Sequence, residues 1–385
     1  MAVVLAGALM WIGISGGLAL SNPAMGTSLA SRAAEWARQN GGASVVNWAE
    51  NLYYSHHAPR EGGTPPKGAI RNVALPAEPA IPDAPPHLEA PAPMTPLASP
   101  PIPGEGDWTP VGRGVGGIPA VYETTLRPDA LHTSYVVGVA WMDTKLLSAT
   151  LYSGSQIPGG GPYTHTAPIS QSAATNLVVA FNAGFLMAAS QGGYYTDAKM
   201  VAPLRDGAAS FVVYRDGSCT VGEWGRDVSM SPQVVSVRQN LDLIVDGGQP
   251  VPGLNAQDTT RWGATLGNAV FVWRSGLGVT ADGALVYVGG PGLNIVDLAQ
   301  ILARAGAVRA MELDINTDWV NFSAYAALPG EQASPSNGTE LLAAMPGTPG
   351  RYFESWWGRD FITMSASPNA LSSLSYGEAP PLPLP

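Results

Sequence analysis

The chain has little cysteine, little charge and few basic residues. Its one cysteine among 385 residues, Cys219, allows no internal disulfide and no cysteine-based zinc site. Charged residues are only 12% of the chain, and 29 Asp and Glu outnumber 19 Lys and Arg, for a formal net charge of −10. A nucleic-acid partner needs a positive surface, so the composition argues against one. In contrast, 46 glycines and 35 prolines predict many turns and extended segments.

The chain begins with a long uncharged stretch. Residues 2–20, AVVLAGALMWIGISGGLAL, would extend about 28 Å as a helix, close to the roughly 30 Å hydrocarbon thickness of a bilayer. We expect residues 1–25 to be a signal peptide or a membrane anchor. A single N-terminal span would place the folded domain outside the cell membrane, and cleavage would make the protein secreted. A buried helix is the alternative.

Composition divides the remaining chain into segments. Residues 26–58 carry short helical patterns. Residues 59–106 are rich in proline and have no periodicity, which predicts a disordered, extended linker that is dispensable for folding. The folded domain is expected over 107–370, followed by a disordered tail over 371–385. This order predicts a domain carried on a stalk.

The signals in the folded domain are mostly those of β-strands. Asp143–Lys145, Asp216–Gly217 and Asp282–Gly283 each separate two β-rich runs, which predicts three hairpins. The apolar run 176–181 predicts a strand buried on both faces. NIVDLAQILARAG, 294–306, predicts a helix with Asn294 as its N-cap. We therefore expect an α+β fold, with a mixed, mostly antiparallel sheet and packed helices.

An acidic cluster follows this helix and a short predicted strand. AMELDINTDW, 310–319, contains Glu312, Asp314 and Asp318. Glu312 and Asp314 alternate along a strand and so share one face, and glycosidases usually employ a pair of carboxylates. Two other interpretations stay open. Asp314 can simply cap a loop, or the three acids with Asn316 can ligate Ca²⁺.

Three short elements follow one another between residues 130 and 325: FNAGFL at 181–186, WRSGLGV at 273–279 and ELDINT at 312–317. In order and spacing they resemble the phosphodiester glycosidase family, with its Asn-Gly-Gly-Phe-Phe, Arg-Thr/Ser-x-x-Gly-Val and Leu-Asp-Gly-Gly-Gly-Ser-Ser elements. The matching residues are Asn182, Gly184, Phe185, Arg274, Ser275, Gly278, Val279, Leu313 and Asp314. Ala183 replaces one glycine, and Ile315-Asn316-Thr317 replace three.

The resemblance implies a phosphodiester-glycosidase-like domain that hydrolyses sugar-1-phosphodiester bonds in a cell-envelope or exported glycoconjugate. Asp314 is then the first candidate for catalysis and Glu312 the second. Arg274 is the expected phosphate anchor, because a guanidinium pairs bidentately with phosphate. The other candidates for substrate binding are Asn182, Gly184, Asn316, Thr317 and Arg205.

The missing glycines mark a departure from the family pattern. A glycine run lets backbone N–H groups cradle a phosphate oxygen, and Ile315 removes part of that cradle. A non-catalytic, glycan-binding module of the cell envelope with the same fold is therefore the alternative function. No cofactor is firmly implied, with a Ca²⁺ or Mg²⁺ ion left open, and the expected partner is a glycan or glycosyl phosphate.

Overall fold

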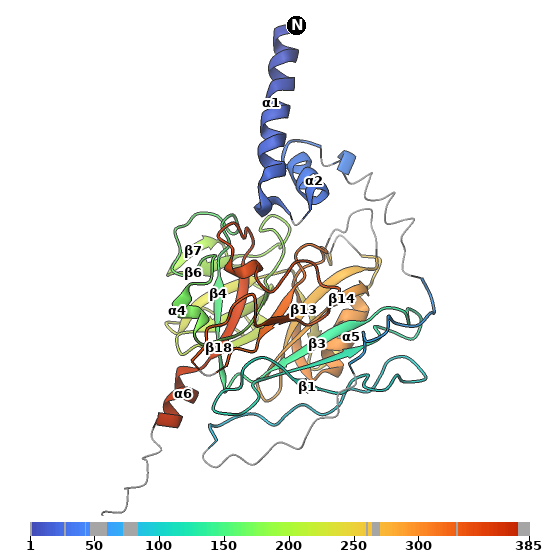
Figure 1. Cartoon of the computed structure of the whole chain (residues 1–385), viewed down its shortest axis with the longest axis vertical. Coiled ribbons are helices and arrows are strands. Elements are labelled where there is room, and N and C mark those ends of the chain that lie inside the picture. Colours follow the sequence, from blue (N-terminus) through green and yellow to red (C-terminus); the bar gives the residue numbers. More distant parts are fainter. Residues whose placement is uncertain are drawn as a thin grey trace, which may run out of the picture.

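The computed structural model describes residues 2–26, 28–42, 44–46, 60–71, 84–258, 261–263, 270–328 and 330–375. Three β-sheets form the body of the molecule, with helices α1 and α2 at one end and α6 at the other (Figure 1). All pairings between the named strands are antiparallel. The predicted α+β class, with mostly antiparallel sheets and packed helices, is confirmed.

The largest sheet has eight strands and carries the acidic cluster at the end of one of them. In spatial order, its strands are β1 (Thr109–Pro110), β2 (Val121–Leu126), β3 (Val137–Met142), β14 (Leu285–Leu293), β13 (Val272–Thr280), β15 (Ala307–Glu312), β11 (Leu243–Asp246) and β12 (Gln249–Pro250).

Helix α5 (Ile295–Arg304) packs on one face of this sheet. Asn294 caps it as predicted, because its Oδ1 accepts bonds from the backbone N–H groups of Val296 and Asp297 at 2.8 and 3.0 Å. Alternation along β14 separates the two faces: Val286 and Val288 pack toward α5, whereas Leu285 and Tyr287 join the central core on the other face.

Two five-stranded sheets share that central core. The first consists of β7 (Lys199–Ala202), β6 (Tyr194–Thr196), β10 (Val234–Gln239), β8 (Ala209–Tyr214) and β9 (Cys219–Glu223). The second consists of β17 (Gly338–Glu340), β16 (Phe322–Tyr325), β5 (Leu177–Asn182), β18 (Phe361–Ala366) and β4 (Leu147–Tyr152). Strand β5 lies between β16 and β18 and is buried throughout, as its apolar run predicts.

Two of the three predicted hairpins form. The Asp216–Gly217 turn joins β8 to β9, and the Asp282–Gly283 turn joins β13 to β14. The third prediction is wrong: β3 pairs with β2 and β14, whereas β4 pairs with β18 in another sheet. Asp143 lies in the connection that leads from β3 in one sheet to β4 in the other, and its carboxylate accepts a bond from the Lys145 N–H at 2.7 Å.

The described part of the proline-rich segment contradicts the predicted free linker. Leu88, Met94 and Ala98 are buried against the domain. The Leu88 N–H donates to the Asp143 carboxylate at 2.7 Å, and the buried pair between Arg127 and Glu105 spans 2.7 Å. Proline runs bury little surface among themselves, but the apolar residues between the prolines find a partner in the β-sheet. Residues 59 and 72–83 of the predicted linker lie outside the described part.

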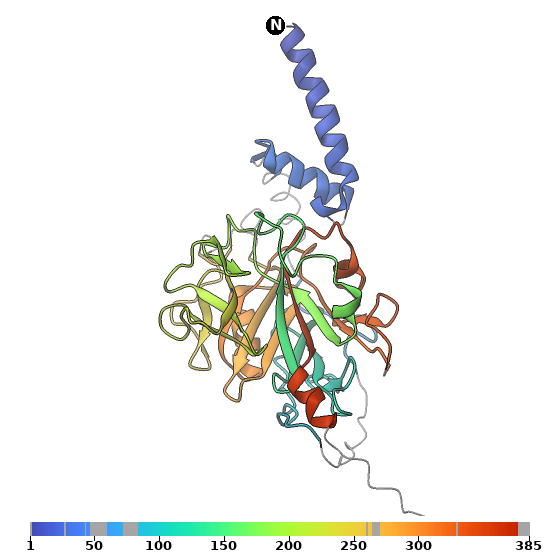
Figure 2. The same cartoon turned by 90° about the vertical axis from the view of Figure 1, so that its left-hand side faces the viewer.

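The remaining helices lie at the ends of the chain and in connections. They are α1 (Ala2–Ser21), α2 (Leu29–Gln39), the short α4 (Gln171–Ala174), α6 (Pro368–Ser375) and the 3₁₀ turns Pro23–Met25 and Arg351–Phe353. Helix α1 projects away from the sheets, and α2 lies across the end of the domain (Figure 2). Residues 47–58 of the predicted helical region and 376–385 of the predicted tail fall outside the described residues, and 371–375 belong to α6.

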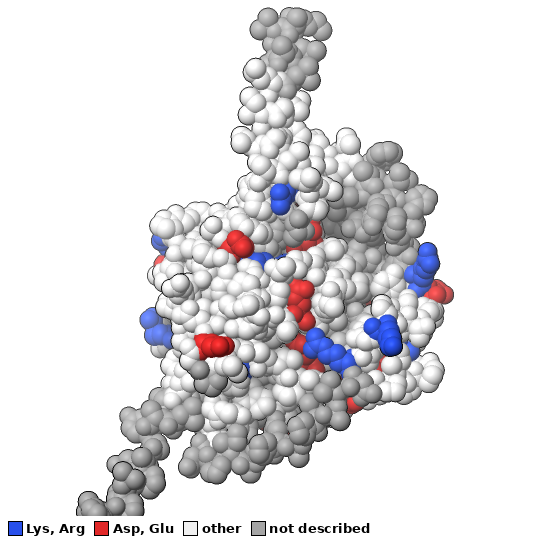
Figure 3. Space-filling model, viewed as in Figure 1, with Lys and Arg blue, Asp and Glu red and all other residues white. Residues whose placement is uncertain are grey.

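The predicted N-terminal membrane span is wrong, and with it the predicted localisation and membrane partnership. Within the described ranges, none of the helices is both long and apolar enough to cross a bilayer. Apart from this helical end, the visible face of the domain is mainly uncharged, with Lys, Arg, Asp and Glu scattered over it (Figure 3).

Candidate active site

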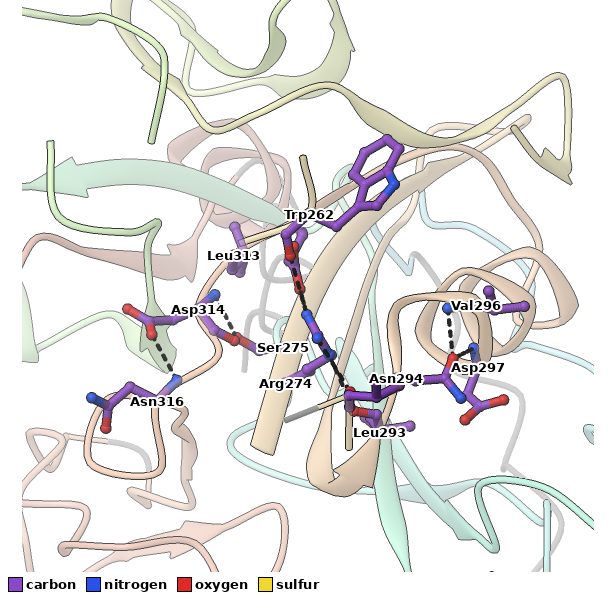
Figure 4. Close-up of polar contacts among 12 residues, drawn as sticks. Trp262, Arg274, Ser275, Leu293, Asn294, Val296, Asp297, Leu313, Asp314 and Asn316 are labelled. Atoms are coloured by element: carbon purple, nitrogen blue, oxygen red, sulfur yellow. Dashed lines mark hydrogen bonds and ion pairs between the residues drawn. The ribbon is translucent and has the colours of Figure 1, made fainter. Parts of the chain in front are cut away.

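The loop that follows β15 is joined to β13 and carries Asp314. The Ser275 N–H donates to the Asp314 carbonyl at 2.8 Å, and the Leu313 N–H donates to the Ser275 carbonyl at 2.8 Å. The Asp314 carboxylate Oδ1 accepts a bond from the Asn316 N–H at 2.9 Å, which closes a tight turn (Figure 4). The backbone of Asp314 is therefore held by β13 and its side chain by the turn, and the residue is only 4% exposed.

Burial raises the pKa of Asp314 to about 6, and nearby Asp360 adds to this. The guanidinium of Arg359 and the backbone N–H groups of Asn316 and Ile315 oppose the shift. A carboxyl that titrates near neutrality can exchange a proton during a reaction, which is what a general base requires. The position and pKa of Asp314 are therefore both suited to catalysis.

Glu312 and Arg274, predicted to act on the substrate, instead form an ion pair with each other. Both residues are at most 1% exposed, and the Arg274 Nη1 contacts the Glu312 Oε1 directly. The rest of the guanidinium bonds to the carbonyls of Leu293, Trp262 and Val270, at 3.1, 3.3 and 3.4 Å (Figure 4 shows the first two). Arg274 is thus fully engaged, which contradicts its predicted role as the phosphate anchor.

Glu312 has one carboxylate oxygen, Oε2, that is buried without a hydrogen-bond partner. Burial raises the pKa of Glu312 to about 7, against the opposing charge of Arg274, and Asp314 adds to the rise. Glu312 reaches no surface, so it influences the site through the charge that it places near Asp314 and through Arg274.

Asn182 lies at the centre of the same network. Its Nδ2 donates to the Ser275 Oγ at 3.0 Å and to the Ala183 carbonyl at 2.9 Å. Its Oδ1 accepts from the Tyr287 hydroxyl at 2.8 Å and from the Asn321 N–H at 3.1 Å. With four bonds and 4% exposure, Asn182 joins β5 to β13 and β14, and these bonds account for an asparagine at this position without a substrate contact.

Gly184 also has a structural role, because it lies against two buried side chains. A Cβ at this position would come within 2.9 Å of the Asn240 Oδ1 and 3.1 Å of the Arg238 Cζ. The Asn240 Oδ1 accepts a hydrogen bond from the Phe185 N–H at 3.1 Å, and its Nδ2 donates one to the Glu312 carbonyl at 2.9 Å. Gly184 permits this close approach, which joins the loop after β5 to the end of β15.

Two of the other predicted substrate-binding residues lie at the surface beside Asp314: Asn316 is partly exposed and Thr317 is exposed. Arg205 does not join them. Its guanidinium bonds to Asp242 at 2.7 Å, to the Gln191 carbonyl at 2.7 Å and to the Leu241 carbonyl at 3.0 Å. Arg205 fastens the loop after β7 and belongs to no contact of the Asp314 network.

The sequence interpretation missed the charged residues that the tertiary structure brings to Asp314. Arg238 forms a buried ion pair with Asp360 at 2.6 Å, and Arg359 interacts electrostatically with Asp314 and Asp360. The Arg359 guanidinium lies over the Trp319 ring, 4.5 Å from its centroid. The only signal in the sequence is an Arg-Asp pair directly before a strand, at 359–360, in a chain with little charge.

Metal binding gains no geometric support. In the parts of the chain that the structure describes, no group of three or more His, Cys, Asp or Glu side chains is placed to hold an ion. Glu312 instead pairs with Arg274, and the Asp318 N–H bonds to the Asn316 side chain at 2.9 Å. A groove of about 570 Å³ between β4 and β8 is lined by other residues and does not include Asp314.

Residues 175–314 match the model of the phosphodiester glycosidase family, so the resemblance is confirmed over that range. The matched range begins just before β5 and ends at Asp314. A search of curated proteins finds no relative that matches the chain.

Three solved structures that match part of the chain are the following. The catalytic domain of zebrafish N-acetylglucosamine-1-phosphodiester alpha-N-acetylglucosaminidase, auto-inhibited by its pro-peptide, has 15% identity and a TM-score of 0.39, covering 68% of this chain and 87% of that one. A hypothetical protein from Synechocystis has 14% identity and a TM-score of 0.34, covering 65% and 63%. A putative exported protein from Burkholderia pseudomallei K96243 has 14% identity and a TM-score of 0.34, covering 60% and 74%.

Proposed function

We propose that the protein is a hydrolase that cleaves sugar-1-phosphodiester bonds. The observation that carries this proposal is Asp314, a nearly buried carboxylate whose pKa is raised to about 6, at the end of the segment that matches the phosphodiester glycosidase family. Arg359, whose guanidinium interacts electrostatically with Asp314, supplies a positive charge suited to an anionic substrate.

In the reaction, the bond between the anomeric carbon and the phosphate oxygen breaks. The oxygen of water forms a new bond to the anomeric carbon, and the electron pair of the broken bond leaves with the phosphate. The products are the free sugar and a phosphomonoester. Phosphate is a good leaving group, so the reaction depends more on activation of water than on a strong general acid.

Asp314 would act in one of two ways. As a general base it would accept the proton of the attacking water; as a nucleophile it would displace the phosphate from the anomeric carbon, and water would then hydrolyse the glycosyl–Asp314 bond and pass its proton to the released phosphate or to solvent. Glu312 would assist indirectly, because it is buried behind Asp314, is paired with Arg274 and interacts electrostatically with the Asp314 carboxylate. Asn182 and Gly184 hold the loops around the site in place, whereas the partly exposed Asn316 and the exposed Thr317 would contact the sugar.

The test is turnover of a simple substrate, the N-acetylglucosamine 1-phosphodiester of methanol. The purified chain should release reducing sugar, and Asp314→Asn should lower kcat by about 100-fold or more, the usual effect of removing an acid or base. Asp282→Asn is the matched control, because Asp282 lies in the turn between β13 and β14 and should leave turnover unchanged. Absence of turnover in the parent chain would contradict the proposal.

The second candidate function is a glycan-binding module without turnover. One observation favours it: Ile315 stands where the family has the first of three glycines, so part of the expected backbone cradle is lost. Binding of the same phosphodiester by the purified chain, with no release of sugar over hours, would establish this alternative.

A further inference from the structure

A substrate with a phosphodiester needs a cation, and two arginines suggested by the sequence are already engaged. Arg274 is paired with Glu312 and three carbonyls, at 1% exposure. Arg205 is paired with Asp242 and two carbonyls away from Asp314. If the proposed function is correct, another residue must recognise the phosphate.

Arg359 has the properties that such a residue needs. It precedes β18, is partly exposed and interacts electrostatically with Asp314. Among the described residues, its guanidinium donates no hydrogen bond to protein and makes no direct ion pair, so its N–H groups are available. The ring of Trp319 supports one face of the guanidinium at 4.5 Å, which fixes the plane and leaves the edge for a ligand.

The N-terminal part of the chain already places an anionic group near Arg359. Glu35 of α2 interacts electrostatically with Arg359, although more than 300 residues separate the two in the sequence. Contacts hold this part of the chain there: a Cβ on Gly358 would come within 3.0 Å of the Ala24 carbonyl, and both Ala24 and Met25 are buried. Helix α2 therefore lies near Arg359.

We propose that Arg359 recognises the phosphate of the substrate, and that the Glu35 carboxylate competes for the same guanidinium. This inference rests on the proposed function and names the specificity-determining residue of its site. The guanidinium forms two parallel bonds to phosphate oxygens, which orients the ester with its sugar toward Asp314. Glu35 offers Arg359 a carboxylate when no phosphate is bound, and so lowers the affinity of the site for anions.

The experiment is titration calorimetry of the full chain at low salt with two probes, N-acetylglucosamine 1-phosphate and the uncharged methyl N-acetylglucosaminide. Arg359→Met should weaken binding of the phosphorylated sugar about tenfold or more, the scale for losing hydrogen bonds to a charged group. It should leave binding of the uncharged sugar unchanged. Glu35→Gln should strengthen binding of the phosphorylated sugar severalfold, because a competing charge is removed.

Arg226→Met is the matched control, because Arg226 is an exposed arginine paired with Asp227 and Asp246 and should not affect either probe. Should Arg359→Met fail to fold, Arg359→Lys retains the charge and loses the bidentate geometry, and severalfold weaker binding is then expected. Unchanged affinity in the Lys variant, or an equal loss for both probes in the Met variant, would overturn the inference. The inference would also be overturned if neither the parent nor Glu35→Gln bound the phosphorylated sugar more tightly than the uncharged sugar.

Binding and turnover separate this inference from the proposed function. Arg359-dependent binding in a chain that releases no sugar would support the inference and reject the hydrolase. If the parent and Arg359→Met released sugar at the same rate, the proposed hydrolase function would stand and the inference about Arg359 would be rejected.

Discussion

Replacing Asp314 by asparagine should reduce activity and increase stability in the same protein. Asparagine keeps the Oδ1 that accepts the Asn316 N–H, so the turn after β15 remains closed. The substitution removes only a negative charge from a nearly buried position. A structural aspartate would behave in the opposite way, because its loss would cost stability.

The magnitude follows from the pKa of Asp314. Raising it from 3.8 to about 6 destabilises the charged form by about 3 kcal/mol at neutral pH. Because the folded-state pKa is the higher one, the native protein binds the proton more tightly than the unfolded chain. The stabilising contribution of protonated Asp314 is therefore complete below about pH 4 and is lost as the pH rises through about 6.

Asp314→Asn should thus equal the parent in free energy of unfolding near pH 4 and exceed it by up to about 3 kcal/mol above pH 7. In the parent, kcat/KM should rise as the pH increases through about 6, because the base must be ionised. Urea unfolding at several pH values and initial rates over the same range give both curves. A loss of stability in Asp314→Asn at both pH 4 and pH 7 would refute the reasoning and identify Asp314 as a cap.

Three further predictions concern the scaffold. Arg238→Met should cost about 3–5 kcal/mol in urea unfolding, because it leaves Asp360 charged and buried; recovery is expected on adding Asp360→Asn, and a cost below about 1 kcal/mol would contradict the pairing. A chain that lacks residues 84–104 should melt several degrees lower than one that retains them, since their apolar side chains are buried, and an unchanged Tm would show that the contacts are dispensable. Gly184→Ala should destabilise the protein by about 1–3 kcal/mol, because the new methyl group would lie 2.9 Å from the Asn240 side chain; an unchanged unfolding midpoint would mean that the loop yields freely.

Short-range patterns in the sequence predict the local structure well. The Asp-Gly turns fix the hairpins β8–β9 and β13–β14, since both strands of each pair adjoin the turn. Asn294 marks the start of α5 for the same reason, because a cap bonds to residues two and three positions ahead. The pairing of β4 with β18 is beyond such patterns, because more than 200 residues separate the two strands.

For the site, the sequence by itself determined that Asn182, Ser275, Glu312 and Asp314 belong together, through three short elements in a familiar order. Only the tertiary structure decided what each charge does. From the sequence alone Arg274 is a good candidate for a phosphate ligand, but in the folded protein it is buried beside Glu312, and each of the two charges compensates the other. Arg359, more than 40 residues beyond Asp314, belongs to no recognised element and becomes the available cation because chain packing brings it to the site.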